Sequence, residues 1–259
     1  MENVKIVFFD IDGTLIDMER KEITSKTIEA LTMLRQNGIR ICIASGRSPM
    51  QVPEFRNVDF DAYLTYNGSY CYDKHGVIFS NPLDREDVRR IIANASAMNR
   101  PLSLATKNRL ASNGADKDLI DYYAFAKISV EVVPDFYEVA ENDEVFQIMV
   151  GSRKEEYASL MDGVRYAKIA TWWDRAVDII PSSGGKGIAI EKILRYYHLE
   201  KDEAMAFGDG NNDIEMLKAV GKGIAMGNAS EELKEAASDV CLSVKNDGIC
   251  HYLKDCGII

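Results

Sequence analysis

The chain has 259 residues, of which 46% are hydrophobic and 28% are charged, and its formal net charge is −10 at pH 7. These proportions are typical of a globular protein and exclude a disordered, collagen-like or coiled-coil chain. The acidic balance lacks the basic surface expected of nucleic-acid-binding proteins, and it disfavours binding to anionic membranes. The length allows one large domain, or a core domain that carries an insert.

The first segment of the chain alternates between strand and helix patterns. Residues 4–9 and 39–44 are short apolar runs, typical of strands that are buried on both faces, and residues 62–64 suggest a third strand. Between the first two runs, apolar residues recur at helical spacing after Ser25, which can cap a helix. An Asn-Gly pair at residues 67–68 marks a turn.

The middle of the chain has a different pattern. One apolar stripe predicts a helix over residues 88–98, and strand-like runs follow at 128–133, 145–150 and 176–180. Because strands outnumber helices here, we expect an α+β insert over residues 83–180 that closes one face of the core.

The last segment alternates again. We expect helices over residues 188–197 and 214–220, strands over 204–207 and 223–226, and a further helix that Ser230 can cap. Strand–helix alternation at both ends of a chain predicts the α/β class.

The predicted fold is therefore a doubly wound, Rossmann-like parallel sheet with right-handed crossovers. Residues 1–82 and 181–259 form this core, and residues 83–180 form an inserted α+β domain.

Compartment and partners follow from what the sequence lacks. The five cysteines fit no zinc-site spacing, and we interpret them as reduced thiols of a cytosolic protein. No signal-peptide pattern opens the chain, and no apolar run approaches the ~20 residues of a membrane span. We expect a cytoplasmic protein with no nucleic-acid and no membrane partner, and the oligomeric state stays open.

Three polar loops follow predicted core strands. They are residues 10–14 (D-I-D-G-T), 45–47 (S-G-R) and 208–213 (G-D-G-N-N-D). Parallel strands of one open sheet point the same way, so these loops share the carboxyl edge, where ligands bind. Residues that are far apart in sequence are thereby expected to become neighbours.

Two of these loops are acidic. Asp10, Asp12, Asp209 and Asp213 would place four carboxylates in one crevice, which is costly unless a cation compensates them. Oxygen ligands suit Mg²⁺, whereas the spacing fits no EF-hand calcium loop. The alternative is that these are ordinary acidic turn residues.

Phosphate-binding groups are expected beside the acidic loops. Ser45 offers a hydroxyl, and Gly46 lets its backbone amide approach a ligand closely. Lys186 opens a predicted helix, where an ammonium group and helix-terminal amides suit an anion. The surrounding S-G-G-K-G is not a Walker A loop, because Gly187 follows the lysine where Ser or Thr is required. A lone lysine of this kind can also be a solvated helix start.

These motifs, in this order, resemble the haloacid dehalogenase (HAD) superfamily. The place of the insert, between the second motif and the lysine, resembles the type IIB, or Cof-like, branch, in which the insert is a C2-type cap domain. The Asn-Gly pair at 67–68 and G-I-A-M-G-N at 223–228 strengthen the resemblance.

The resemblance implies a catalytic mechanism. Asp10 matches the nucleophile that forms an aspartyl-phosphate, and Asp12 matches the general acid and base. Mg²⁺ would be held by the Asp10 side chain, the Asp12 backbone carbonyl and Asp209, with Asp213 in the outer shell.

The resemblance also implies the substrate contacts. Ser45, Gly46, Lys186 and Asn212 match phosphate contacts, and Arg47 is a further candidate, although it could pair with an acidic neighbour instead.

Two residues of the insert are candidate substrate contacts as well. Trp173 could stack on a sugar ring, unless Trp172 and Trp173 simply alternate across a strand. Asp178 could bond sugar hydroxyls or pair within the sheet.

The leading hypothesis is a magnesium-dependent phosphatase of small phosphorylated metabolites, with sugar phosphates as the expected class. A phosphomutase of the same superfamily and a non-catalytic phospho-ligand sensor remain as alternatives. An intact Asp12 argues against the sensor, because a pure binder needs no proton shuttle.

Overall fold

The computed structural model describes residues 3–55 and 58–259, which form two compact units. As far as it is described, the first unit consists of Met1–Ser45, Pro53–Phe79 and Lys186–Ile259. The second unit consists of Gly46–Val52 and Ser80–Gly185. The first unit is therefore assembled from both ends of the chain.

The first unit contains an eight-stranded sheet. Its strands are β1 (Ile6–Phe9), β2 (Arg40–Ala44), β3 (Ala62–Thr65), β4 (Tyr70–Asp73), β5 (Gly76–Ser80), β11 (Ala204–Gly208), β12 (Lys222–Ala225) and β13 (Asp239–Val240). Their order is β13-β12-β11-β1-β2-β3-β4-β5. Pairing is parallel from β13 to β3, but β4 is antiparallel to β3. The α/β prediction is confirmed, with a sheet that is mixed rather than wholly parallel.

Alternate residues of the central strands pack against two layers of helices, one on each face of the sheet. Ile6 and Phe8 share a core cluster with apolar residues of α6 (Lys186–Tyr196) and α7 (Ile214–Lys218). On β11, Phe207 stacks on Phe9 of β1 and meets Tyr252 of α9 (Gly248–Asp255) edge to face. Strands that are buried on both faces explain the continuous apolar runs.

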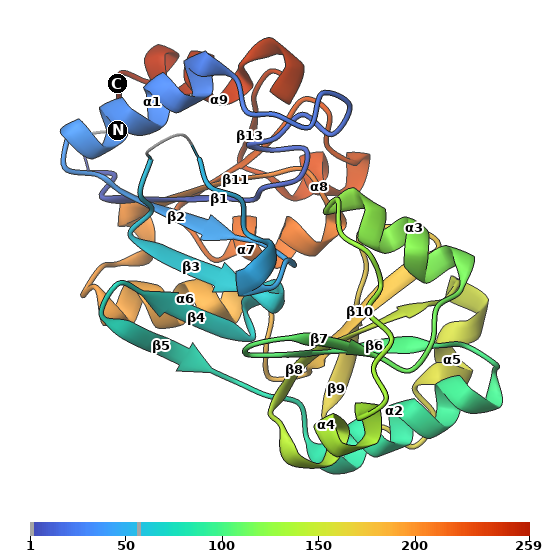
Figure 1. Cartoon of the computed structure of the whole chain (residues 1–259). Coiled ribbons are helices and arrows are strands. Elements are labelled where there is room, and N and C mark those ends of the chain that lie inside the picture. Colours follow the sequence, from blue (N-terminus) through green and yellow to red (C-terminus); the bar gives the residue numbers. More distant parts are fainter. Residues whose placement is uncertain (1–2, 56–57) are drawn as a thin grey trace. The chain divides into compact units, whose positions relative to one another are not determined.

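Local signals place the helices around this sheet. Thr24, not Ser25, caps α1 (Ser25–Gln36) by accepting the Thr27 amide, and Ser230 caps α8 (Glu231–Ala236) as expected. Figure 1 shows α1 beside α9 on one side of the sheet and α6 beside α7 on the other.

The second unit is built on a five-stranded sheet. Its strands are β6 (Leu102–Thr106), β7 (Leu110–Ser112), β8 (Val145–Gly151), β9 (Ala167–Ala170) and β10 (Ala176–Pro181), in the order β7-β6-β8-β10-β9 and antiparallel throughout. Its helices are α2 (Arg85–Ala97), α3 (Lys117–Phe125), α4 (Phe136–Asn142) and α5 (Tyr157–Leu160). This is an α+β arrangement (Figure 1).

The predicted strand over residues 128–133 is wrong. Only Val132 pairs there, in an isolated bridge to Ser112, and Ile128 and Val132 are exposed. Without a neighbouring strand to bury them, β-branched residues do not make a strand.

None of the helices in the described parts of the chain is long and apolar enough to cross a membrane.

Candidate active site

The end of β1 places a carboxylate beside a buried lysine. Asp10 directly follows β1, and its backbone N–H still donates to the Phe207 carbonyl of β11 at 3.1 Å. Lys186 is the first residue of α6 and is 1% exposed. Its Nζ donates to Asp10 Oδ1 at 2.7 Å and to Asp213 Oδ1 at 2.5 Å. The lysine thereby joins two loops that are about 200 residues apart in the sequence.

The Asp213 carboxylate is fully engaged by protein donors. While Oδ1 accepts from Lys186, Oδ2 accepts the backbone N–H groups of Asp209 at 3.0 Å and Gly210 at 3.1 Å. Gly208 makes room for it, because a Cβ there would lie 2.7 Å from the Asp213 Cβ. Asp213 thus holds both the lysine and the turn after β11.

Asp209 lies against the turn that follows Asp10. Its Oδ1 accepts from the Thr14 hydroxyl at 3.1 Å, and its Oδ2 accepts from Asn228 Nδ2 at 3.4 Å. Gly13 has a φ of +86°, and a Cβ on it would lie 2.0 Å from Asp209 Oδ2. The glycine is therefore required both by its left-handed backbone and by the approach of the carboxylate.

The electrostatics of the site are those of crowded acid groups. Asp10, Asp209 and Asp213 each offer one carboxylate oxygen, and these three oxygens lie within 4.8 Å of one another. Burial raises the pKa of Asp10 to about 7, although Lys186 opposes the shift. Burial, together with the Asp10 charge, also raises the pKa of Asp209. Burial alone would lower the pKa of Lys186, but Asp10 and Asp213 outweigh it and raise the pKa.

This donor set suits a hard divalent cation. Three carboxylates face one ammonium group, so the cluster carries excess negative charge when its acids are ionised. All of the offered ligand atoms are oxygens, which is the chemistry that Mg²⁺ prefers. Burial first, and then the neighbouring carboxylates, raise the pKa values of Asp10 and Asp209, and a cation bound among them would favour their ionised forms.

Other predicted residues lie in the surrounding loops of the first unit. Asp12 is half-buried in a tight turn, where its backbone forms an isolated β-bridge with Ile16. Ser45 is buried, and its carbonyl accepts from the backbone of Asn67 at 3.0 Å. Asn67 Oδ1 in turn accepts from Asn212 Nδ2 at 3.1 Å. Ser45 and Asn212 are thus linked through Asn67, to which the sequence analysis assigned no role at the site.

Gly46 and Arg47 fall into the second unit. The Gly46 carbonyl accepts from Gln147 Nε2 of β8 at 3.1 Å, and Arg47 Nη1 donates to the Gln51 carbonyl at 2.9 Å.

The two tryptophans do not alternate across a strand. Both lie in the bend between β9 and β10, where they are half-buried and stack on each other with ring centroids 6.2 Å apart. Phe125 of α3 meets both rings edge to face, and the Arg175 guanidinium lies 4.9 Å from the Trp173 ring centroid. The pair forms one aromatic cluster.

Asp178 lies beneath that cluster, on β10. Its carboxylate is completely buried and accepts from the Tyr122 hydroxyl of α3 at 2.6 Å. Burial and the Asp178 charge raise the pKa of Tyr122, which therefore stays a neutral donor. Asp178 holds Tyr122 in place rather than presenting its own oxygens to solvent.

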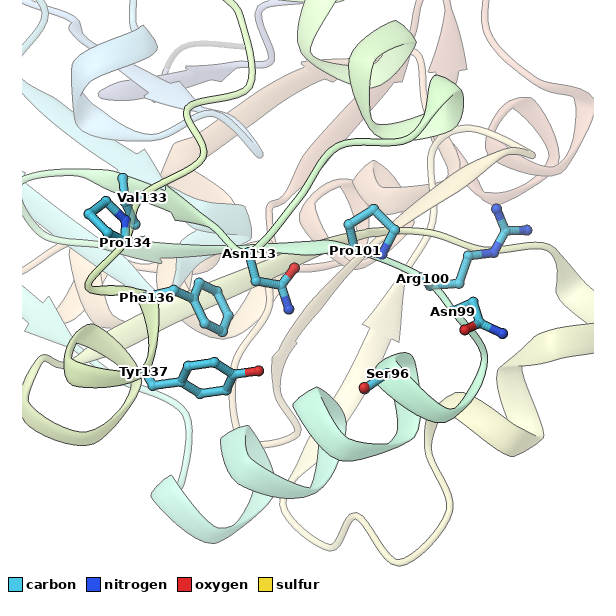
Figure 2. Close-up of a pocket in the computed structure, with 9 residues that line it drawn as sticks. All are labelled: Ser96, Asn99, Arg100, Pro101, Asn113, Val133, Pro134, Phe136 and Tyr137. Carbon is cyan, nitrogen blue, oxygen red and sulfur yellow. The ribbon is translucent and has the colours of Figure 1, made fainter.

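A pocket of about 440 Å³ also lies in the second unit, between the end of α2 and the start of α4 (Figure 2). Its charged member is Arg100, whose guanidinium is ion-paired with Asp116, Asp118 and Glu156. None of the predicted site residues lines this pocket.

Three residues of the site were not assigned by the sequence analysis. Thr14 and Asn228 lie inside quoted motifs, but no local sequence pattern indicates that both donate hydrogen bonds to Asp209. Asn67 entered the sequence analysis as part of a turn pair that strengthens the family resemblance, with no role at the site. Their roles depend on long-range hydrogen bonds that only the folded sheet creates.

Comparisons with known proteins point in one direction. A family model described as haloacid dehalogenase-like hydrolase matches residues 7–253. YkrA of Bacillus subtilis, provisionally named a phosphatase, is 32% identical over 98% of both chains. An HMP-PP phosphatase of Yersinia pseudotuberculosis is 27% identical over 96% of this chain and 94% of its own. The solved structure of the HAD subclass IIB sugar phosphatase BT4131 is 32% identical, covers 99% of this chain and 100% of its own, and superposes with a TM-score of 0.91.

Proposed function

Because the chain belongs to the haloacid dehalogenase-like hydrolases and is a phosphatase of that family, we propose that it is a magnesium-dependent phosphatase of small phosphorylated metabolites, with sugar phosphates as the substrate class. The observation that carries this proposal is the cluster of Asp10, Asp209 and Asp213 around the buried Lys186. The similarity to a sugar phosphatase over the whole chain favours the substrate class.

The reaction proceeds in two steps on this chain's own carboxylates. The Asp10 carboxylate attacks phosphorus, an aspartyl-phosphate forms, and the ester oxygen leaves. Asp12 donates a proton to that oxygen and then takes one from the water that hydrolyses the aspartyl-phosphate. Asp10 must be ionised to attack, and the Lys186 ammonium group at 2.7 Å favours that form. Burial opposes ionisation, so the lysine is needed for the first step.

Asp10, Asp209 and the backbone carbonyl of Asp12 would hold Mg²⁺, which supplies positive charge against the phosphoryl oxygens when bound. Asp213 takes the outer position, because its two oxygens already accept from Lys186 and from the turn amides.

The phosphoryl group itself is held by neutral and cationic donors. Ser45, Gly46, Lys186 and Asn212 provide a hydroxyl, backbone N–H groups, an ammonium group and an amide. Phosphoryl transfer needs mainly positioning and charge stabilisation from the protein, and this set of groups provides both.

The two units take different roles in this proposal. The first unit is the hydrolase core, and the second is the cap domain that supplies substrate contacts. The half-buried Trp173 remains the candidate for a contact with a sugar ring. Arg47 adds charge, whereas Asp178 contributes by orienting Tyr122. The five thiols are all unpaired by disulfides, which fits a reducing, cytoplasmic compartment.

The first experiment measures phosphate release from a panel of phosphorylated sugars, nucleotides and cofactors. We expect Mg²⁺-dependent turnover by the wild type and none by Asp10→Asn. Asp84→Asn is the matched control, because Asp84 is an exposed cap of α2 and asparagine caps a helix equally well.

Other results of this experiment would refute the mechanism or identify another function. Full activity of Asp10→Asn refutes the covalent mechanism. An isomerised sugar phosphate without free phosphate identifies a phosphomutase, and binding of phosphate esters without turnover identifies a sensor.

A further inference from the structure

The turn after β3 has an unusual backbone. Tyr66, Asn67 and Gly68 follow one another with φ values of +53°, +52° and +89°. A left-handed conformation is rare for residues other than glycine and is an outlier for a bulky residue such as tyrosine. Both Tyr66 and Asn67 are buried, at 1% and 2% exposed. Such strain persists only where the surrounding structure holds it, and it concentrates at functional sites.

The contacts of this turn lead to the active site of the first unit. The Asn67 backbone N–H donates to the Ser45 carbonyl at 3.0 Å, and its side-chain Oδ1 accepts from Asn212 Nδ2 at 3.1 Å. The turn also packs against α6, the helix that Lys186 opens. One residue thus touches the loops after β2 and β11.

Backbone geometry alone does not explain an asparagine here. Glycine would adopt this conformation with less strain, yet the chain has a residue whose side chain is buried and bonded. The side chain therefore has its own role, and its bonded partner is Asn212.

The hydrogen bond to Asn67 fixes the orientation of the Asn212 side-chain amide. An amide group has two N–H donors on nitrogen and one acceptor oxygen. Asn67 takes one N–H of Asn212, while Asn212 Oδ1 faces Gly210, where a Cβ would lie 2.6 Å from it. The second N–H of the same nitrogen, on the donor edge of the amide, is then left for another acceptor. An anionic phosphoryl group accepts hydrogen bonds only, so it requires this edge and is repelled by the oxygen.

We propose that Asn67 is a positioning residue of the phosphatase, which acts through Asn212 by holding its donor edge toward the phosphoryl group. This inference rests on the proposed function, in which Asn212 binds phosphate. Asn67 itself makes no contact with the substrate in this scheme.

The test is a double-mutant cycle between Asn67→Gly and Asn212→Ala. Asn67→Gly keeps the left-handed backbone and the N–H to Ser45, and removes the side chain, whose Oδ1 accepts from Asn212. We expect this variant to fold and to lower kcat/KM by about tenfold, which corresponds to losing the hydrogen bond from Asn212 to the charged phosphoryl group. Competitive inhibition by inorganic phosphate should weaken in parallel. In the Asn212→Ala background the same change should lower kcat/KM by less than about twofold, because the group through which Asn67 acts is gone.

Asn99→Gly is the matched control. Asn99 also has a left-handed backbone, with a φ of +55°, but it is exposed in the second unit. We expect wild-type kcat and KM for this variant, and thermal midpoints for both glycine variants close to that of the wild type.

Two outcomes overturn the inference. One is a tenfold loss in both backgrounds, since additivity means that Asn67 does not act through Asn212. The other is a lowered thermal midpoint of Asn67→Gly with kinetics unchanged, which is a purely structural role. Failure of the proposed function is separate, because it appears as a wild type that releases no phosphate. In that case the cycle is read from the Kd of inorganic phosphate, and additivity there again overturns the inference.

Discussion

Gly13→Ala tests the acidic cluster by adding one methyl group and removing nothing. The new Cβ would lie 2.0 Å from Asp209 Oδ2 and 2.6 Å from its Cγ, whereas real Cβ contacts stay above 3.0 Å. The carboxylate must therefore move by at least the difference, 3.0 minus 2.0, or about 1 Å. A misplacement of about 1 Å in a catalytic constellation can cost about a hundredfold in rate. We expect a loss of that size in kcat/KM and a higher Mg²⁺ requirement.

Gly38→Ala separates this displacement from backbone strain. Gly38 has a φ of +76°, similar to the +86° of Gly13, but no atom lies within 4 Å of an added Cβ. Gly38→Ala should lose about 1–2 kcal/mol of unfolding free energy in urea titrations, which is the cost of a left-handed alanine, and Gly13→Ala should lose at least as much, because it also displaces the Asp209 carboxylate. Only Gly13→Ala should lose activity.

The measurements are kcat/KM as a function of Mg²⁺ concentration and the urea midpoint of each variant. The reasoning is wrong if Gly13→Ala keeps kcat/KM within about threefold of the wild-type value, or if Gly38→Ala loses as much activity as Gly13→Ala does.

Three further predictions concern the ion pairs and the metal. Lys186→Met leaves two buried carboxylates without their cation, so the free energy of unfolding at pH 8 should fall by about 3–5 kcal/mol; an unchanged urea midpoint would contradict the pairing. Hydrogen bonds from Arg153 and then Arg175 hold the pKa of Asp118 well below its ordinary 3.8. Its stabilising effect is therefore complete above about pH 5 and is lost as the pH falls below that value, so Asp118→Asn should cost about 2 kcal/mol at pH 7 and less at pH 3. Equal costs at both pH values would refute this account. Chelation with EDTA should stop phosphate release and excess Mg²⁺ should restore it, and a rate that ignores EDTA would remove the metal from the mechanism.

The core sheet was predictable because its strands are buried on both faces. Continuous apolar runs identified β1, β2, β3, β11 and β12 to within two residues at each end. Strands at the sheet edge gave weaker patterns. The edge strand β5 was not predicted, because an exposed strand needs no continuous apolar run. Its neighbour β4 is mostly buried, but its sequence Y-C-Y-D contains no branched aliphatic residue and therefore gives no apolar run.

The acidic site was predictable in outline for a topological reason. Asp10 and Asp209 follow parallel neighbours, β1 and β11, so the sheet itself brings them together. Lys186 was less certain, because a lysine at a helix start is usually solvated, and only the fold reveals that it is 1% exposed. Asn67 could not be assigned, since its two partners are 22 and 145 positions away and no local pattern encodes such bonds.

The central position of β1 also constrains how the protein is made. Ile6 pairs with Arg40 on one side and with Ala204 on the other, which is 204 minus 6, or 198, residues later. A growing chain therefore cannot complete β1 until β11 has left the ribosome. Until then, β1 exposes an apolar edge of the kind that pairs with other chains. We expect translation that stops before residue 208 to yield an aggregation-prone fragment in which Asp10 is not yet held beside Lys186, so that these two side chains become neighbours only near the end of synthesis.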